Sequence, residues 1–181
     1  GNPIIYQGEE LGLPQGEVAF EDLLDPEAIA NWPHTLGRDG TRTPMPWSAD
    51  ARHAGFSTAD RTWLKLDPAH AGLAIDSQAA DPASTLSFTR QLLAVRREHA
   101  ALVRGGITVL DSPQDVLAFL RHDGERRVLC VFNLGESTSF WNAPPHVGML
   151  GLIATESAVG SGYLPGALDP GTGYWASASG G

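Results

Sequence analysis

The sequence predicts a chain that joins two fold classes, an α/β part followed by an all-β part. Three observations support this prediction. The chain opens on an unbroken apolar run at residues 3–7, a strong helix pattern begins at Asp81, and short alternating apolar runs replace it after Gly106. A buried strand with a later helix is typical of α/β folds, whereas successive short strands with turn residues between them are typical of antiparallel β domains.

The apolar run at residues 3–7 ends at Gly8 and predicts a fully buried strand of a parallel sheet. From Leu11 to about Asp81 the chain is rich in Pro, Gly and Asp, and it predicts only short helical turns, such as one at residues 22–32. So long a connection between a strand and a helix normally indicates a functional loop.

The clearest helix begins with Asp81 at the N-cap and Pro82 at the first helical position. Its apolar side comprises Leu86, Phe88, Leu92, Leu93, Val95 and Leu102, and we expect Gly105 and Gly106 to end it.

The remaining residues predict six or seven short strands packed as a small antiparallel β-sandwich. Asp123 and Gly124 indicate a hairpin turn. The expected strands are residues 107–110, 116–121, 126–133, 137–141, 149–155 and a last one near 174–175. Cys130 falls inside one of these runs, which indicates a buried strand residue. The Gly/Ser/Ala-rich tail from Ala176 is expected to fray.

Composition excludes several function classes. The chain has 181 residues, 42% of them hydrophobic, and a net charge of −9, which disfavours binding to nucleic acid. No apolar run approaches the roughly 20 residues of a membrane span. The single cysteine fits a cytoplasmic protein and equally a periplasmic one. His34, His53 and His70 follow no zinc spacing, so we expect neither a metal nor a cofactor. The start on Gly1 favours a C-terminal fragment over a complete protein.

A candidate binding loop lies at residues 37–47 (GRDGTRTPMPW), where two arginines precede two prolines. Pro44 and Pro46 disfavour a helix here and stiffen the segment. The guanidinium groups of Arg38 and Arg42 suit carboxylates or paired sugar hydroxyls. The alternative is an internal salt bridge with Asp39 or another acid.

This loop, residues 1–12 (GNPIIYQGEELG) and residues 54–56 (AGF) together resemble one family. They resemble the α-glucosidases and oligo-1,6-glucosidases of the α-amylase superfamily, glycoside hydrolase family 13. The resemblance implies that residues 1–104 are the end of a (β/α)8 barrel, comprising strand 8, a long loop and the last helix. Residues 105–181 are then the antiparallel β domain that follows the barrel.

The resemblance also implies a retaining, exo-acting hydrolysis of terminal α-glucosidic bonds in short oligosaccharides. The nucleophile, the acid/base and a third Asp are expected upstream of Gly1, in the missing N-terminal barrel portion of the same protein, so this segment is expected to be inactive alone. Three alternatives remain: a sucrose- or trehalose-processing transglucosylase, a catalytically dead relative, and a free-standing carbohydrate-binding module.

Six substrate-binding candidates follow from the resemblance. Arg38 is expected to reach the non-reducing glucose, with Arg42 beside it. Tyr6 and Glu9 lie at the strand end, where packing and backbone hydrogen bonding are the alternatives to substrate contact. Phe20 is a candidate for stacking on a sugar face. Glu17 is expected to border the second sugar, unless it is simply a solvated acid.

Overall fold

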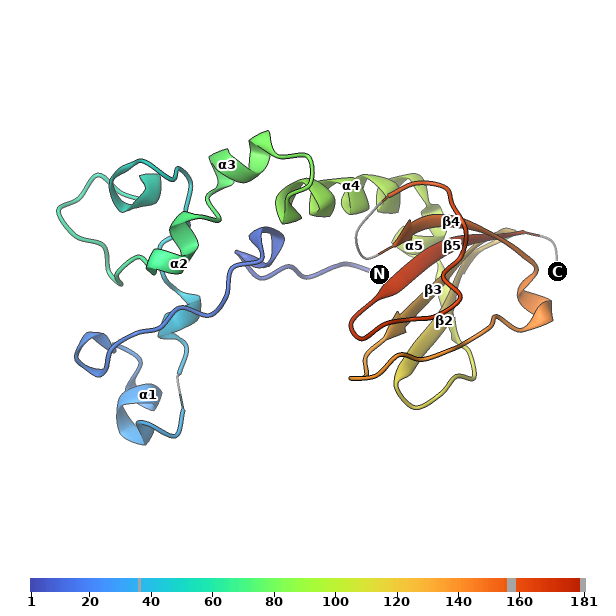
Figure 1. The fold of residues 1–181 in the computed structure, drawn as a ribbon, viewed down its shortest axis with the longest axis horizontal. Helices are drawn as coiled ribbons and strands as arrows, with labels where there is room; N and C mark the ends of the chain where they lie inside the picture. Colours follow the sequence, from blue (N-terminus) through green and yellow to red (C-terminus); the bar gives the residue numbers. More distant parts are fainter. Residues whose placement is uncertain (36, 156–158, 180–181) are drawn as a thin grey trace. The chain divides into compact units, whose positions relative to one another are not determined.

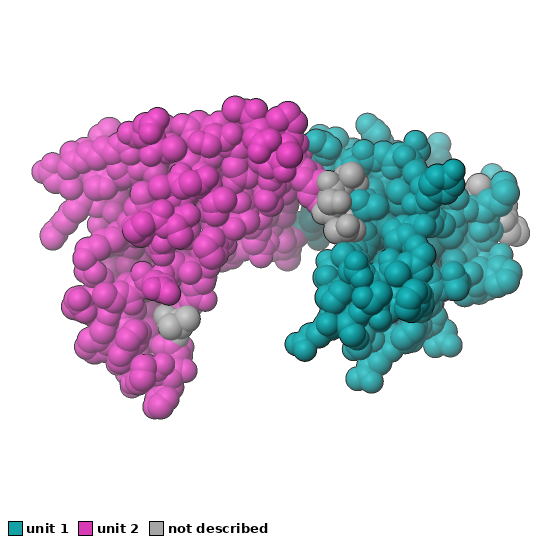
Figure 2. All heavy atoms as spheres, viewed as in Figure 1, with its two compact units in different colours: residues 1–3, 90–181 teal, residues 4–89 magenta. Residues whose placement is uncertain are grey.

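The structure is a computed structural model that describes residues 1–35, 37–155 and 159–179. It divides into two compact units, one formed by Ile4–Thr89 and the other by Gly1–Pro3 with Arg90–Gly181 (Figure 2). The sequence places a domain boundary between residues 104 and 105, and that boundary stays a prediction.

The helices and strands follow one another as the two-class prediction requires, with helices first and strands after them (Figure 1). The helices are α1 (Pro26–Asn31), α2 (Pro68–Ala71), α3 (Ile75–Ala80), α4 (Thr85–Glu98) and α5 (Ala100–Arg104). The strands are β1 (Gly106–Val109), β2 (Val116–Asp123), β3 (Arg126–Asn133), β4 (Met149–Thr155) and β5 (Gly173–Ser179). Short 3₁₀ helices occupy Glu9–Leu11, Phe20–Asp22, Asp39–Thr41, Arg52–Gly55 and Pro145–Val147.

The unit Ile4–Thr89 is the long, loop-rich connection that the sequence predicts. Two of its helices, α1 and α2, start on an Asp-Pro pair. Asp25 accepts a hydrogen bond from the Glu27 amide, and Asp67 accepts one from the Ala69 amide. Inside the unit, the buried Gln78 amide group donates to the Leu11 carbonyl at 2.9 Å. Side-chain hydrogen bonds of this kind replace a regular sheet in holding the loop together.

The expected strand at residues 3–7 is wrong for this structure. Residues 3–7 form no regular element, and Ile4 is 94% exposed. A parallel strand needs hydrogen-bonded neighbours on its edges, and the described residues supply none for this run.

The predicted helix start is also wrong. Asp81 ends α3, its carboxylate accepts a hydrogen bond from the Ala83 amide at 2.8 Å, and α4 begins only at Thr85. The capping role passes to Ser84, whose Oγ accepts from the Ser87 amide at 3.2 Å. The helix is then interrupted at His99, whose backbone is extended, before α5 continues to Arg104.

The strands form one antiparallel sheet in the order β1-β2-β3-β5-β4, which confirms the predicted antiparallel β domain. The expected sandwich of six or seven strands is not found among the described residues, which form a single sheet of five strands. The β2–β3 hairpin pairs Asp123 with Arg126, and Gly124 takes the positive φ of 62° that its turn requires. Residues 137–141 do not form the expected strand; they contribute an isolated bridge between Ser139 and Leu168.

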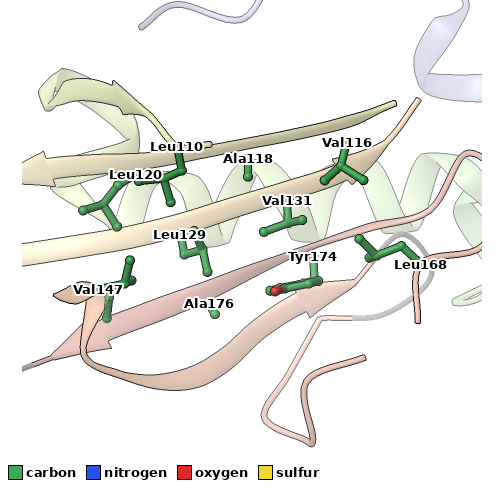
Figure 3. Packing of buried hydrophobic residues seen from close by; sticks show 11 residues of the cluster. Leu110, Val116, Ala118, Leu120, Leu129, Val131, Val147, Leu168, Tyr174 and Ala176 are labelled. Carbon is green, nitrogen blue, oxygen red and sulfur yellow. The ribbon is translucent and has the colours of Figure 1, made fainter. Parts of the chain in front are cut away.

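Two clusters of buried hydrophobic residues pack against the sheet, and Figure 3 shows the larger of them. One face packs around Leu129 and Val131 of β3, where Val147 and Leu168 from the connecting segments close the core. The opposite face packs Cys130 and its neighbours against α5. The strand position of Cys130 is therefore confirmed, and burial raises the pKa of its thiol to about 12, which disfavours a nucleophilic role.

The expected fraying of residues 176–181 is wrong for residues 176–179, and residues 180 and 181 lie outside the described residues. Ala176 pairs with Leu129 of β3 on one side and with Leu152 of β4 on the other, so β5 is an inner strand as far as Ser179. Its small side chains fit because Ala176 and Ala178 face the packed core. In the part of the chain that the structure describes, none of the helices has the length and apolar character needed to span a membrane.

Candidate functional site

A cavity of about 650 Å³ lies inside the unit Ile4–Thr89, between the N-terminal segment and the loop of residues 37–47, which carries Arg38 and Arg42 and which we call the double-arginine loop. The two sides meet where the Tyr6 hydroxyl lies 3.4 Å from both the carbonyl and the hydroxyl of Thr41. The lining is mixed in polarity, as in pockets that bind small polar ligands. It comprises Ile5, Tyr6, Gln7, Gly8, Glu9, Leu13, Pro14, Gln15, Gly40, Thr41, Arg42, Thr43, Met45, Phe56 and His70.

The N-terminal side of the cavity is held by acidic side chains that fold back on the backbone. The Glu9 carboxylate accepts a hydrogen bond from the Tyr6 amide at 3.0 Å, and the Glu10 carboxylate accepts one from the Gly8 amide at 2.9 Å. Gly8 has a φ of 106°, which L side chains rarely adopt. Glu9 therefore makes the backbone contact that was the alternative to substrate binding, while it still lines the cavity.

The buried His70 is hydrogen-bonded to two residues of the cavity lining, Pro14 and Thr43. Its Nε2 lies 2.8 Å from the Pro14 carbonyl, to which it donates, and its Nδ1 lies 3.2 Å from the Thr43 hydroxyl. A neutral imidazole satisfies both contacts, with Thr43 as the donor to Nδ1. Sequence reasoning considered His70 only as a metal ligand. The described residues contain no cluster of three or more potential metal ligands.

Arg42 lines the cavity. No hydrogen bond or ion pair joins its side chain to any residue that the structure describes. A fixed loop with a free guanidinium is suited to carboxylates or to neighbouring hydroxyls of a ligand.

Arg38 has a partner, and the partner is Asp25. Its Nε and Nη2 donate to the two carboxylate oxygens of Asp25 at 2.8 and 2.7 Å, and its backbone amide donates to the same carboxylate at 2.9 Å. These hydrogen bonds hold the pKa of the Asp25 carboxyl well below its usual range. The internal salt bridge that was the alternative for Arg38 is therefore present, with Asp25 and not with Asp39.

The other two candidates lie outside the cavity lining. Phe20 packs on Trp32 with ring centroids 5.6 Å apart, and it remains 48% exposed. The exposed Glu17 is held through its backbone, whose amide donates to Asp67 at 2.8 Å. The amides of Ala69 and Glu17 hold the pKa of the Asp67 carboxyl below its usual range. Tyr6, Glu9 and Arg42 are thus brought together in one cavity, and Arg38, Glu17 and Phe20 are placed beyond its lining.

Sequence reasoning missed Asp25, Gln15, Thr41 and His70 as parts of this region. The Asp-Pro pair at residues 25 and 26 was the available signal, because such a pair is typical of a helix N-cap, and here Asp25 caps α1 and is buried. Nothing in the sequence indicated that Thr41 would meet Tyr6.

Comparisons with known proteins point to one family. Residues 1–105 match the family described as "Alpha amylase, catalytic domain". The relative "Probable alpha-glucosidase" of Rhizobium meliloti (strain 1021) is 38% identical over 169 residues, which are 93% of this chain and 29% of that protein. The "Trehalose synthase" of Thermus thermophilus is 39% identical over 154 residues, which are 80% of this chain and 14% of that protein.

Solved structures agree with these matches. The crystal structure of the alpha-glucosyl transfer enzyme XgtA shares 40% sequence identity with this chain and superposes with a TM-score of 0.83. The match covers 96% of this chain and 32% of XgtA. The chain therefore spans about a third or less of the length of the relatives that it matches here.

Proposed function

This chain belongs to the alpha-amylase family, glycoside hydrolase family 13, and on that premise we propose that it is the C-terminal part of a retaining, exo-acting α-glucosidase. In this proposal the whole protein removes glucose from the ends of short α-glucosides. The chain contributes pocket walls, and the N-terminal barrel portion of the same protein contributes the catalytic acids.

The cavity is the observation that carries the proposal. It brings together Arg42, whose guanidinium has no partner among the residues that the structure describes, and the hydroxyl-bearing residues Tyr6 and Thr41, an arrangement that suits a ring of sugar hydroxyls. Retaining glycosidases need two carboxyl groups about 5 to 5.5 Å apart. The acidic residue of this lining is Glu9, and its carboxylate is engaged with the Tyr6 amide. The chain therefore supports binding of a glucoside and lacks a catalytic pair in its cavity.

A transglucosylase is the second candidate. It is supported by the 40% identity to the alpha-glucosyl transfer enzyme and the 39% identity to the trehalose synthase. Both activities share the covalent glucosyl–enzyme intermediate of the retaining mechanism, and they differ in whether water or a sugar hydroxyl attacks it. A catalytically dead relative is the third candidate, and the activity of the whole protein decides it.

The test is the product spectrum of the whole protein. We expect turnover of maltose and isomaltose with α-glucose as the first product by proton NMR, and much slower turnover of soluble starch. Transfer products from sucrose, trehalose or maltose as the main outcome would favour the transglucosylase. A preference for starch, or β-glucose as the first product, would contradict the exo-acting, retaining proposal, and no turnover of any of these sugars would contradict both enzyme candidates.

A further inference from the structure

Two pairs of consecutive residues are hydrogen-bonded to each other, Leu24 with Asp25 and Arg38 with Asp39. In each pair, the aspartate carboxylate accepts hydrogen bonds from the other pair. The Asp25 carboxylate accepts the backbone amide and the guanidinium of Arg38. In return, Oδ2 of Asp39 accepts the amides of Leu24 and Asp25 at 2.6 and 2.8 Å. We call these four residues the clasp. It joins the start of α1 to the double-arginine loop.

The clasp is buried on its acidic side. Asp25 is 1% exposed and Asp39 is fully buried. Both oxygens of Asp25 accept hydrogen bonds, whereas Asp39 is held through Oδ2, and its buried Oδ1 has no partner among the described residues. Gly37 permits the close approach, because a Cβ there would lie 2.4 Å from the Cβ of Ala28 in α1. Three consecutive residues of the loop, Gly37, Arg38 and Asp39, thus contact α1 or its N-cap residue Asp25.

The Arg38 side chain, by contrast, is 62% exposed. Asp25 engages the edge of the guanidinium formed by Nε and Nη2. Nη1 has no partner among the residues that the structure describes, so its two N–H groups remain available for a ligand. A bidentate carboxylate fixes the plane of a guanidinium as well as its position.

We propose that Asp25 is a positioning residue, which holds one edge of Arg38 so that the opposite edge is presented to the hydroxyls of a glucoside bound in the cavity. Arg38 adjoins the lining of that cavity, because the hydroxyl of the lining residue Thr41 donates to the Arg38 carbonyl at 2.8 Å. This inference rests on the proposed function of the whole protein. Asp25 does not touch the substrate; it acts through Arg38. Asp39 supports it by fixing the backbone from which the Asp25 side chain projects.

A double-mutant cycle in the whole protein tests the proposal, with kcat/KM on p-nitrophenyl α-glucoside as the readout. Asp25→Asn keeps the shape of the side chain but replaces one acceptor oxygen with a donor, which breaks the bidentate contact. We expect kcat/KM to fall about 10- to 100-fold in the wild-type background and less than about threefold in an Arg38→Ala background. Equal losses in the two backgrounds would overturn the proposal.

The matched control is Asp60→Asn. Asp60 also pairs with an arginine, Arg52, at 3.2 Å, but both side chains are exposed. The same chemical change there is expected to leave kcat/KM unchanged in both backgrounds. If Asp25→Asn does not fold, Asp25→Glu replaces it, because it keeps the charge and moves the carboxylate by one methylene. A loss of at least about tenfold in kcat/KM supports the proposal, and wild-type kinetics overturn it.

A second readout separates the clasp from the proposed function. The Arg38 Nε–H resonance, assigned by its loss in Arg38→Lys, should exchange slowly with solvent in the wild type and in Asp60→Asn, and rapidly in Asp25→Asn. Rapid exchange in the wild type would overturn the clasp itself. A slow signal in a protein without activity on any α-glucoside would overturn the proposed function, and with it the role of Arg38 toward glucose, while the clasp stands.

Discussion

At the scale of single residues, Arg38 and Arg42 differ sharply in their surroundings although they lie four positions apart. Arg42 lines the cavity without a partner among the described residues, whereas Arg38 is bound to Asp25. The sequence showed that two guanidiniums sit on a stiff loop, and it left open whether Arg38 binds an internal acid. It could not identify Asp25, because the partner lies thirteen positions away and its position depends on how the intervening residues fold back.

Replacement of Arg38 tests its contribution to substrate binding. In the whole protein we expect Arg38→Ala to lower kcat/KM about 100- to 10,000-fold, because it removes the guanidinium and leaves Asp25 buried without its partner. Arg38→Lys should recover little of the lost kcat/KM, since the ammonium group of lysine cannot form the two parallel hydrogen bonds of a guanidinium. The measurement is steady-state kinetics on an aryl α-glucoside, with Arg52→Ala as the control. Near-normal kinetics in Arg38→Lys would assign Arg38 a structural role.

The Asp25–Arg38 pair also predicts a pH dependence of stability. The pKa of Asp25 is lowered in the folded protein, so its contribution is fully present above the unfolded-state pKa of about 3.9 and is lost as the pH falls toward the folded-state value. Urea unfolding from pH 7 to pH 3 should show a wild-type advantage over Asp25→Asn that is constant above about pH 5 and narrows below about pH 4. An advantage that grows on acidification would contradict this account.

At the scale of elements, strands were predicted better than helix ends. The alternation of residues 116–121 and the Asp-Gly turn placed the β2–β3 hairpin correctly, because burial on two faces and a positive φ leave direct traces in the sequence. The start of α4 was missed because Asp81 and Ser84 both provide capping oxygens three residues apart, and tertiary context decides between them. The strand predicted at residues 3–7 is absent from the structure, because an apolar run indicates burial but does not supply the neighbouring strands that burial requires.

The close contact between the double-arginine loop and α1 can be tested by replacing Gly37. Gly37→Ala should destabilise the protein by about 1–3 kcal/mol, because the residue has a φ of 59° and its new Cβ would lie 2.4 Å from the Cβ of Ala28. The control is Gly72→Ala, where a Cβ would meet nothing within 4 Å, and the change should stay within about 0.5 kcal/mol. Urea unfolding measures both. Equal effects in the two variants would mean that the close approach is unimportant.

At the scale of the whole molecule, the proposal gives this chain a binding surface, and the lining of its cavity contains one acidic residue, Glu9, and therefore no pair of carboxyl groups. The family was accessible from sequence because three motifs occur in the right order, and the family match over residues 1–105 confirms it. The linkage preference was not accessible, because relatives with both glucosidase and synthase names share this part of the chain at similar identity. Residues that distinguish those activities are expected in the remaining barrel portion of the protein.

The central claim is that the catalytic acids lie outside these 181 residues. It is tested most directly by an assay of p-nitrophenyl α-glucoside hydrolysis by two samples. One is the isolated 181-residue chain, and the other is the whole protein that contains it. We predict turnover by the whole protein and none by the isolated chain, because a retaining glycosidase requires a nucleophile and an acid/base together. Hydrolysis by the isolated chain above a buffer control would contradict the account, since it would place a complete catalytic set among these residues.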